Sequence, residues 1–310
     1  MLQDSDWRYK FFTKRTMGTI LTNPATTIAE KLQQKFDSLT RAERQLANSL
    51  LDNYPVSGLT SITTVAQNAD VSTPTVARMV QKLGFSGYPE FQSALRGELE
   101  ARISNPIAKH DNWATTAPET HILNRFADAV IENVRQTLGQ LDPVEFDGAC
   151  TMLADKERSV YIVGGRITRA LADYMFTHLQ VAREKVTLIP SNSNTWPHYV
   201  LDMQAGDALV VFDVRRYEHD ILKLAELAKE RGVEIILFTD QWSSPVSKFA
   251  TYRFNCRIEV PSAWDSSTAT MLIVETMIAS VQDRTWNITS DRMEALEKLF
   301  DRTKLFRKFI

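Results

Sequence analysis

The chain has 310 residues, of which 44% are apolar and 24% are charged, and its formal net charge is −2. This composition is typical of a protein that buries a core, and it excludes a polycation that attracts nucleic acid through its overall charge. The two cysteines, Cys150 and Cys256, have no further Cys or His beside them, so the sequence predicts neither a disulfide framework nor a metal site.

Residues 1–27 show no regular hydrophobic period, and we expect a flexible N-terminal arm, with Met17 as an alternative start of the protein. The arm has acids before its bases and no long apolar block, unlike a signal peptide. No stretch of about 18 apolar residues follows that could span a bilayer. We therefore expect a cytoplasmic protein that does not contact a membrane.

Residues 28–103 show helical patterns throughout. One helix begins after Thr40, and Glu43 stands three residues later, where it completes a capping box. A short helix lies within "LTSITTVAQNADVS", and the next lies within "STPTVARMVQKLG" and ends at Gly84. The sequence therefore predicts a domain of short packed helices.

The last two of these helices are joined by the four residues "ADVS", which is the spacing of a helix-turn-helix motif. Ser72 or Thr73 caps the second helix, whose outer face carries side chains that can read base edges and phosphates in a major groove. The residues predicted to bind DNA are Ser72, Thr73, Thr75, Arg78, Gln81 and Lys82.

A polar face occurs on any amphipathic helix, so the pattern alone leaves a purely structural helix as the alternative. Residues 28–104 carry about as many acids as bases. Because phosphate neutralisation dominates affinity for DNA, one copy of such a domain would bind DNA weakly. We therefore expect DNA binding by a dimer or a larger assembly.

Residues 104–120 lose all periodicity and are rich in Asn, Pro, Ala and Thr, which predicts a linker. Residues 121–310 then alternate helical segments with apolar runs. The strand candidates are "SVYIVGG", "KVTLI", "DALVVFDV", "VEIILFTD" and "YRFNCRIEV". Near-continuous apolar strands separated by helices predict a doubly wound, five-stranded parallel sheet with helices on both faces. The chain is thus predicted to be an all-α domain followed by an α/β domain.

The stretch "TVAQNADVSTPTVARMVQKLGFSGYPEFQSALRGEL" resembles the N-terminal domain of the RpiR/MurR family of bacterial transcription regulators, and the similarity covers residues 28–102. The resemblance implies a helix-turn-helix domain that binds double-stranded operator DNA. It also implies that a SIS (sugar isomerase) domain follows, and residues 121–285 resemble one. Asp70 stands where relatives often have glycine, and we expect the turn to survive because Asp tolerates a left-handed backbone.

A SIS domain binds phosphosugars at loops that usually read GxGxS and SxSGxT. Here the first loop is "GGRIT" and the second is "DVRRYE", which has lost the row of hydroxyls and gained two arginines. The residues that the resemblance implies in effector binding are Gly164, Gly165, Arg166, Thr168, Asp213, Arg215, Arg216, Tyr217 and Ser267. Trp264 is a further candidate for the lining of this pocket.

Two interpretations of Asp213 stay open. In the first, the arginines bind a carboxylate or a highly charged phosphate, while Asp213 selects a hydroxyl or an ammonium group. In the second, Asp213 pairs with an arginine and fills the pocket, which leaves a domain that mainly dimerises.

We expect a DNA-binding transcription regulator, a repressor, whose SIS-like domain forms a homodimer or a tetramer and senses a phosphosugar or another small anionic, sugar-derived metabolite. We expect no cofactor, no metal ion and no catalytic residue. One alternative is a sugar-phosphate isomerase, for which Glu275 and His219 are the nearest acid/base candidates. The other is a DNA-binding regulator with a vestigial pocket.

Overall fold

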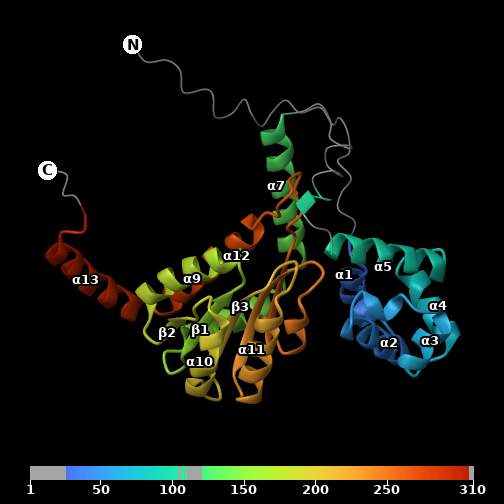
Figure 1. Ribbon diagram of the computed structural model, residues 1–310, viewed down its shortest axis with the longest axis horizontal. Helices are drawn as coiled ribbons and strands as arrows, with labels where there is room; N and C mark the ends of the chain where they lie inside the picture. Colours follow the sequence, from blue (N-terminus) through green and yellow to red (C-terminus); the bar gives the residue numbers. More distant parts are fainter. Residues whose placement is uncertain (1–25, 104–105, 108, 110–120, 307–310) are drawn as a thin grey trace, which may run out of the picture.

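A computed structural model describes residues 26–103, 106–107, 109 and 121–306 (Figure 1). The predicted N-terminal arm lies outside the described residues except for its end, where the buried Thr27 caps the first helix. Most of the predicted linker also lies outside them. Two parts of different architecture are present, a helical part that begins near residue 26 and an α/β part that begins at residue 121.

The helical part packs five helices around one core. They are α1 (Ile28–Lys35), α2 (Arg41–Asp52), α3 (Ile62–Asn68), α4 (Thr73–Lys82) and α5 (Tyr88–Ile103), with 3-10 turns at Phe36–Ser38 and Val56–Gly58. Leu46, Met79 and Phe91 are fully buried between them. The capping box of Thr40 and Glu43 is present at the start of α2, as predicted.

The α/β part is built on a five-stranded parallel sheet in the order β2-β1-β3-β4-β5, which confirms the predicted fold class. The strands are β1 (Val160–Gly164), β2 (Val186–Leu188), β3 (Ala208–Phe212), β4 (Glu234–Asp240) and β5 (Tyr252–Cys256). Every residue of β1 and β3 is buried. Strands this apolar require cover on both faces of the sheet.

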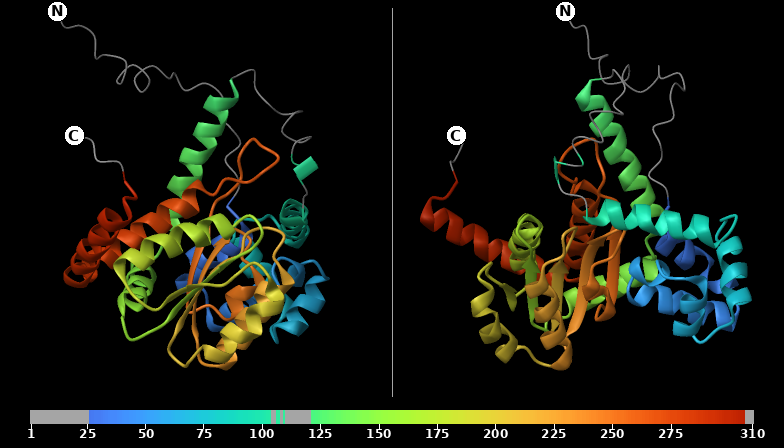
Figure 2. Two further views of the ribbon diagram at one scale, coloured as in Figure 1. Left: turned by 60° about the vertical axis from the view of Figure 1, so that its left-hand side comes forward. Right: turned by 45° about the vertical axis from the view of Figure 1, so that its right-hand side comes forward.

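Helices supply that cover in two layers (Figure 2). One face packs against α7 (Ile122–Gln140), α8 (Pro143–Ala154), α9 (Arg169–Ala182) and α12 (Thr268–Arg284). The other face packs against α10 (Trp196–Asp202) and α11 (His219–Glu230), together with the 3-10 turn Pro245–Lys248. A further 3-10 turn, Ser193–Thr195, precedes α10 and buries no residue. The last helix, α13 (Trp286–Thr303), contacts α9 and projects from the body of the molecule. None of the described helices is long and apolar enough to cross a membrane.

The strand order reverses direction between β1 and β3. The chain leaves β1 toward β2 on one side and leaves β3 toward β4 on the other. The loops that follow these two strands therefore diverge and open a crevice at the carboxyl edge of the sheet, which is where doubly wound folds bind ligands. Residues 165–168 and 213–218 form these loops.

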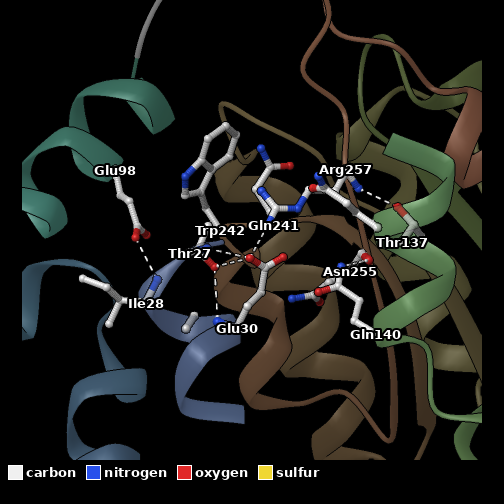
Figure 3. A network of polar contacts seen from close by, with 12 residues as sticks. Thr27, Ile28, Glu30, Glu98, Thr137, Gln140, Gln241, Trp242, Asn255 and Arg257 are labelled. Atoms are coloured by element: carbon white, nitrogen blue, oxygen red, sulfur yellow. Dashed lines mark hydrogen bonds and ion pairs between the residues drawn. The ribbon is translucent and has the colours of Figure 1, made fainter. Parts of the chain in front are cut away.

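The helical part is joined to the α/β part by a buried ion pair. The Glu30 carboxylate of α1 contacts the Arg257 guanidinium just beyond β5, and both side chains are at most 4% exposed (Figure 3). The backbone N–H of Arg257 donates to Thr137 Oγ1 on α7 at 2.9 Å. Because removing one member would leave a buried charge unpaired, this contact fixes how α1 lies against the sheet.

Candidate functional site

The turn between α3 and α4 has the backbone of a helix-turn-helix. Asp70 adopts the left-handed conformation with φ 49°, and the N–H of Val71 returns to Ala66 O at 2.9 Å. Ser72 is the N-cap, since its hydroxyl accepts from the N–H of Thr75, and a proline occupies the first turn of α4. Gly84 follows the end of α4 with φ 93°. The sequence predicted the tolerated turn at Asp70, the cap at Ser72 or Thr73 and the glycine that follows α4.

The outer face of α4 consists of Arg78, Gln81 and Lys82, all exposed, with Ser72 exposed and Thr73 half-buried at its start. Thr75 was expected on this face, but only 6% of it is exposed. It precedes the buried Met79 by one turn and so lies at the edge of the core face. Its hydroxyl accepts from Arg78 Nη2 at 3.4 Å and so helps to position that guanidinium.

Lys82 has a structural partner. Its Nζ lies 2.7 Å from Glu43 Oε2 at the start of α2. Burial raises the pKa of the Glu43 carboxyl, but hydrogen bonds from Lys82 and Thr40 outweigh it, so the pKa lies below its ordinary value. The pair stabilises the orientation of α4 on α2 and neutralises much of the Lys82 charge. Arg78 and Gln81 therefore dominate the exposed chemistry of this helix.

A cavity of about 510 Å³ lies at the crevice between β1 and β3. Of the residues predicted for effector binding, those that line it are Gly165, Arg166, Thr168, Asp213, Arg215, Arg216 and Ser267. Trp264 lines it as well. Gly164 lies behind the loop, where a Cβ would approach Thr168 O to 2.7 Å. Tyr217 is also outside the lining, and its hydroxyl donates to Asp240 Oδ1 at 2.7 Å.

Several hydrogen-bonding groups of the first loop already have partners within the chain. The Thr168 hydroxyl donates to Phe212 O at 2.8 Å, so it joins the two loops instead of facing the cavity. The backbone N–H of Arg166 donates to Glu218 Oε1 at 2.7 Å. A carboxylate of the chain itself thus sits where the loops of a phosphate site present their N–H groups to an anion.

Asp213 is buried and accepts hydrogen bonds from the Ser244 hydroxyl and, at 3.3 Å, from the N–H of Glu218. Among the described contacts no arginine pairs with Asp213, so the second interpretation requires correction, whereas the first, in which Asp213 selects a polar group of a ligand, stays a prediction. Burial raises the pKa of Asp213 to about 6, although the hydrogen bonds from Ser244 and Glu218 lower it in part. Asp213 therefore shapes the second loop.

Arg215 is held by several groups and is only 8% exposed. Its Nε lies 2.6 Å from Asp265 Oδ2, and its Nη1 donates to Ala101 O at 2.5 Å. Lys109 Nζ contacts the same carboxylate at 2.5 Å. Nothing in the sequence pointed to Lys109 or Asp265, because their pairing unites a predicted linker with a loop far along the chain.

Arg166 and Arg216 differ from Arg215. Their side chains are exposed at the cavity, and no carboxylate of the described residues pairs with either. Two free guanidinium groups on neighbouring loops can bind the oxygens of a carboxylate or a phosphate in two-point fashion. This is the strongest anion-binding feature of the cavity.

The candidates for isomerase chemistry do not line this cavity. Glu275 lies on α12, where it accepts from the Tyr174 hydroxyl at 3.0 Å, and His219 begins α11 as an exposed residue. Within the described part of the chain, no group of His, Cys, Asp and Glu side chains could hold a metal ion.

Two regions of the chain match known domain families. Residues 26–102 match the helix-turn-helix domain of the rpiR family, and residues 152–280 match the SIS domain. The HTH-type transcriptional regulator HexR of Pseudomonas aeruginosa is 27% identical over 232 residues, which cover 72% of this chain and 76% of HexR. The HTH-type transcriptional regulator RpiR of Escherichia coli is 24% identical over 226 residues, which cover 73% of this chain and 74% of RpiR.

Solved structures share the fold. The sugar isomerase domain of an RpiR transcription factor from Sphaerobacter thermophilus is 21% identical, with a TM-score of 0.53, and the match covers 57% of this chain and 97% of that domain. Vibrio vulnificus NanR, solved with ManNAc-6P, is 18% identical with a TM-score of 0.53, and the match covers 90% of this chain and 99% of NanR. The second match includes both parts of the chain.

Proposed function

We propose that this protein, which belongs to the RpiR family of DNA-binding transcription regulators, reads operator DNA with helix α4 and senses a small anionic metabolite in the cavity between β1 and β3. The chain joins an rpiR-type helix-turn-helix domain to a SIS domain, and its curated relatives HexR and RpiR are regulators, so it is not an enzyme. We place the helix-turn-helix domain at residues 28–103, the linker at 104–120 and the effector domain at 121–310.

One observation carries the DNA-binding proposal. Helix α4 buries Val76, Met79 and Val80 and exposes Arg78 and Gln81 on its other side. Arginine makes two-point contacts with guanine, and glutamine makes them with adenine, so this face carries the donors that major-groove recognition needs. We propose that Ser72, Thr73 and Lys82 contact the sugar-phosphate backbone of the DNA at the ends of this face. Thr75 acts indirectly, because it positions Arg78.

The free arginines of the cavity support the sensing proposal. Arg166 and Arg216 suit an acidic ligand, either a carboxylate or a phosphate of a sugar derivative. Vibrio vulnificus NanR, which shares the fold, was solved with ManNAc-6P, so a sugar phosphate is a reasonable first ligand to test. We further propose that the protein represses its targets as a homodimer or a tetramer in the cytoplasm, because one near-neutral helix-turn-helix domain would hold DNA weakly.

The substitution Arg78→Ala tests the DNA-binding proposal. Loss of a two-point base contact weakens binding by about 1–3 kcal/mol, so we expect the Kd for the best duplex selected from a random pool to rise about 10- to 100-fold. The base preference at one position of the site should also relax. Gel shifts measure the affinity, and repeated selection measures the preference.

Arg96→Ala is the matched control, because Arg96 is an exposed arginine on the neighbouring helix α5. It should leave both affinity and preference close to those of the unaltered protein. An Arg78→Ala protein that binds the selected duplex as tightly as the control, with the same base preference, would show that α4 is not the recognition helix.

A further inference from the structure

An ion-pair cluster lies in the lining of the cavity and contacts the end of helix α5. Asp265, in the loop before α12, contacts Arg215 through two pairs of atoms, Oδ2 to Nε at 2.6 Å and Oδ1 to Nη2 at 3.2 Å. The same carboxylate holds Lys109 Nζ at 2.5 Å. We call Lys109, Arg215 and Asp265 the Asp265 cluster. All three residues line the cavity.

The Asp265 cluster reaches the helix-turn-helix domain directly. Arg215 Nη1 donates to Ala101 O in the last turn of α5 at 2.5 Å. The last carbonyls of a helix have no partner within the helix, and a cation is the favoured group to cap them. Arg102 of the same turn lies over the Tyr217 ring, 4.6 Å from its centroid. The loop of residues 213–218 thus contacts the end of α5 through two of its side chains.

The backbone of this loop is held in an uncommon conformation. Arg215 and Arg216 have φ values of 35° and 54°, in the left-handed region that side chains with a Cβ rarely adopt. The N–H of Arg215 donates to the buried Asp240 Oδ2 at 2.6 Å, and its guanidinium stacks on Trp242. Such conformations persist only where surrounding contacts maintain them, and they concentrate at ligand sites and switches.

The charges of the Asp265 cluster indicate which group of a ligand could take the place of the Asp265 carboxylate. It is the more exposed partner, with 19% of its side chain accessible, whereas Lys109 and Arg215 are each 8% exposed. A carboxylate group in the cavity carries the same charge and the same oxygen geometry as Asp265, and a phosphate group offers three oxygens and more negative charge. Either group can therefore replace this side chain against the two cations.

We propose that Asp265 is an internal counter-anion, and that the acidic group of the effector takes over its contacts with Arg215 and Lys109, so that occupancy of the cavity is transmitted to the end of α5. This inference rests on the proposed function and adds its regulation. Helix α5 packs against α4 through the core, where Phe91 and Leu95 are buried. A change at Ala101 O can therefore be transmitted to the recognition helix through the packed side chains of α5 and α4.

Chemical rescue of Asp265→Ala tests this proposal. Removing the carboxylate takes this partner from Lys109 and leaves Arg215 with Glu259, whose Oε1 lies 3.5 Å from Arg215 Nη2. Because the contact of Arg215 with Asp265 is lost, we expect amide hydrogen exchange in the last turn of α5 to accelerate at least about 5-fold. Sodium formate supplies a free carboxylate of matching size, and it should restore slow exchange in Asp265→Ala in a concentration-dependent way. Sodium chloride at equal ionic strength should not. Asp265→Glu, which keeps the charge, should retain most of the protection.

Asp147→Ala is the matched control. It removes an Asp–Arg ion pair of the same 2.6 Å length, between α8 and Arg284 of α12. It should leave exchange in α5 unchanged, with or without formate. Circular dichroism establishes that both alanine variants are folded. Unchanged exchange in Asp265→Ala, or accelerated exchange that formate does not restore, would overturn the proposal.

The affinity for the selected duplex gives the second readout. In Asp265→Ala it should differ from that of the unaltered protein by about 5- to 150-fold, and formate should reverse the difference. An equal affinity in the two proteins would overturn the proposal. Failure to select any duplex contradicts the proposed DNA binding instead, and the exchange experiment, which uses no DNA, still decides whether the Asp265 cluster controls α5.

Discussion

Three carboxylates decide which anion the cavity can accept. Glu218 accepts from the N–H of Arg166, Asp213 is buried at the start of the second loop, and Asp265 pairs with Arg215 and Lys109. An anion that depended on the first loop for its hydrogen bonds would have to displace Glu218. The exposed Arg166 and Arg216 need no such displacement, so we propose that an acidic effector binds there first.

A buried carboxylate in the helical part gives a pH-dependent stability. Glu98 accepts hydrogen bonds from the N–H of Ile28 at 2.8 Å and from the Tyr54 hydroxyl. Burial raises its pKa from 4.5 to about 7, although these hydrogen bonds lower it in part. Between these pH values the folded protein keeps a proton that the unfolded chain has lost. Stability therefore falls as pH rises from about 4.5 to about 7, and then levels off.

Glu98→Gln removes this titration and keeps the acceptor oxygen. Relative to the unaltered protein, the variant should gain about 2–3 kcal/mol in free energy of unfolding between pH 5 and pH 8, since each pKa unit is worth about 1.4 kcal/mol. Urea unfolding at the two pH values measures the difference, with Glu100→Gln on the same helix as control. A difference independent of pH would contradict the assignment.

At the residue scale, the sequence predicted which side chains are exposed better than it predicted their hydrogen-bond and ion-pair partners. Arg78 and Gln81 are exposed as their helical spacing indicated. Thr75 is buried instead. It lies at the boundary between the buried and the exposed face of α4, where a helical period of 3.6 residues does not decide whether a side chain is buried. The partner of Asp213 is Ser244, and that of Arg215 is Asp265. These contacts depend on how distant loops fold together, which local spacing does not contain.

The elements themselves were largely predictable. All five predicted strands are present, and the central strands β1, β3 and β4 are largely apolar runs, because a strand buried on both faces needs such a run. Ser72 caps α4 as proposed, and Gly84 ends it. Helix α10 was not predicted. It has only seven residues, and its opening "SNSNTWP" reads as a loop, so its packing on the sheet decides its structure.

Two glycines of the helical part should respond in opposite directions to alanine. Gly84 has φ 93°, which a Cβ disfavours, so Gly84→Ala should destabilise the protein by about 1 kcal/mol. Gly97 lies within α5 with open space around it, so Gly97→Ala should stabilise the protein by up to about 1 kcal/mol. Thermal unfolding compares the two variants, and a shift of the same sign in both would contradict these backbone assignments.

At the scale of the whole molecule, the described residues tie the helical part to the α/β part at two places, of which the end of α5 carries two contacts. The buried pair of Glu30 and Arg257 fixes α1 near the end of β5, and Arg215 fixes the end of α5 at the cavity (Figure 3 shows the first contact). An effector at the cavity lies next to only the second. The first contact therefore provides a pivot about which a released α5 could reorient the recognition helix.

The charge of the helical part is the reason why we propose a dimer. Its acids and bases are nearly balanced, and Lys82, one of the two cations on α4, is paired with Glu43. Such a domain gains little from phosphate neutralisation, so we propose that a second copy, held by the α/β part, supplies the remaining affinity. A symmetric dimer presents two α4 helices and reads two equivalent half-sites.

Selection of duplexes from a random pool by the full-length protein, followed by sequencing, tests this account most directly. We predict enrichment of a palindrome whose half-sites are centred about 10 base pairs apart, or a multiple of that spacing. Loss of the enrichment in the Arg78→Ala protein would complete the result. A pool that shows no enrichment at low salt, or that yields a single unrepeated half-site, would contradict DNA recognition by paired α4 helices.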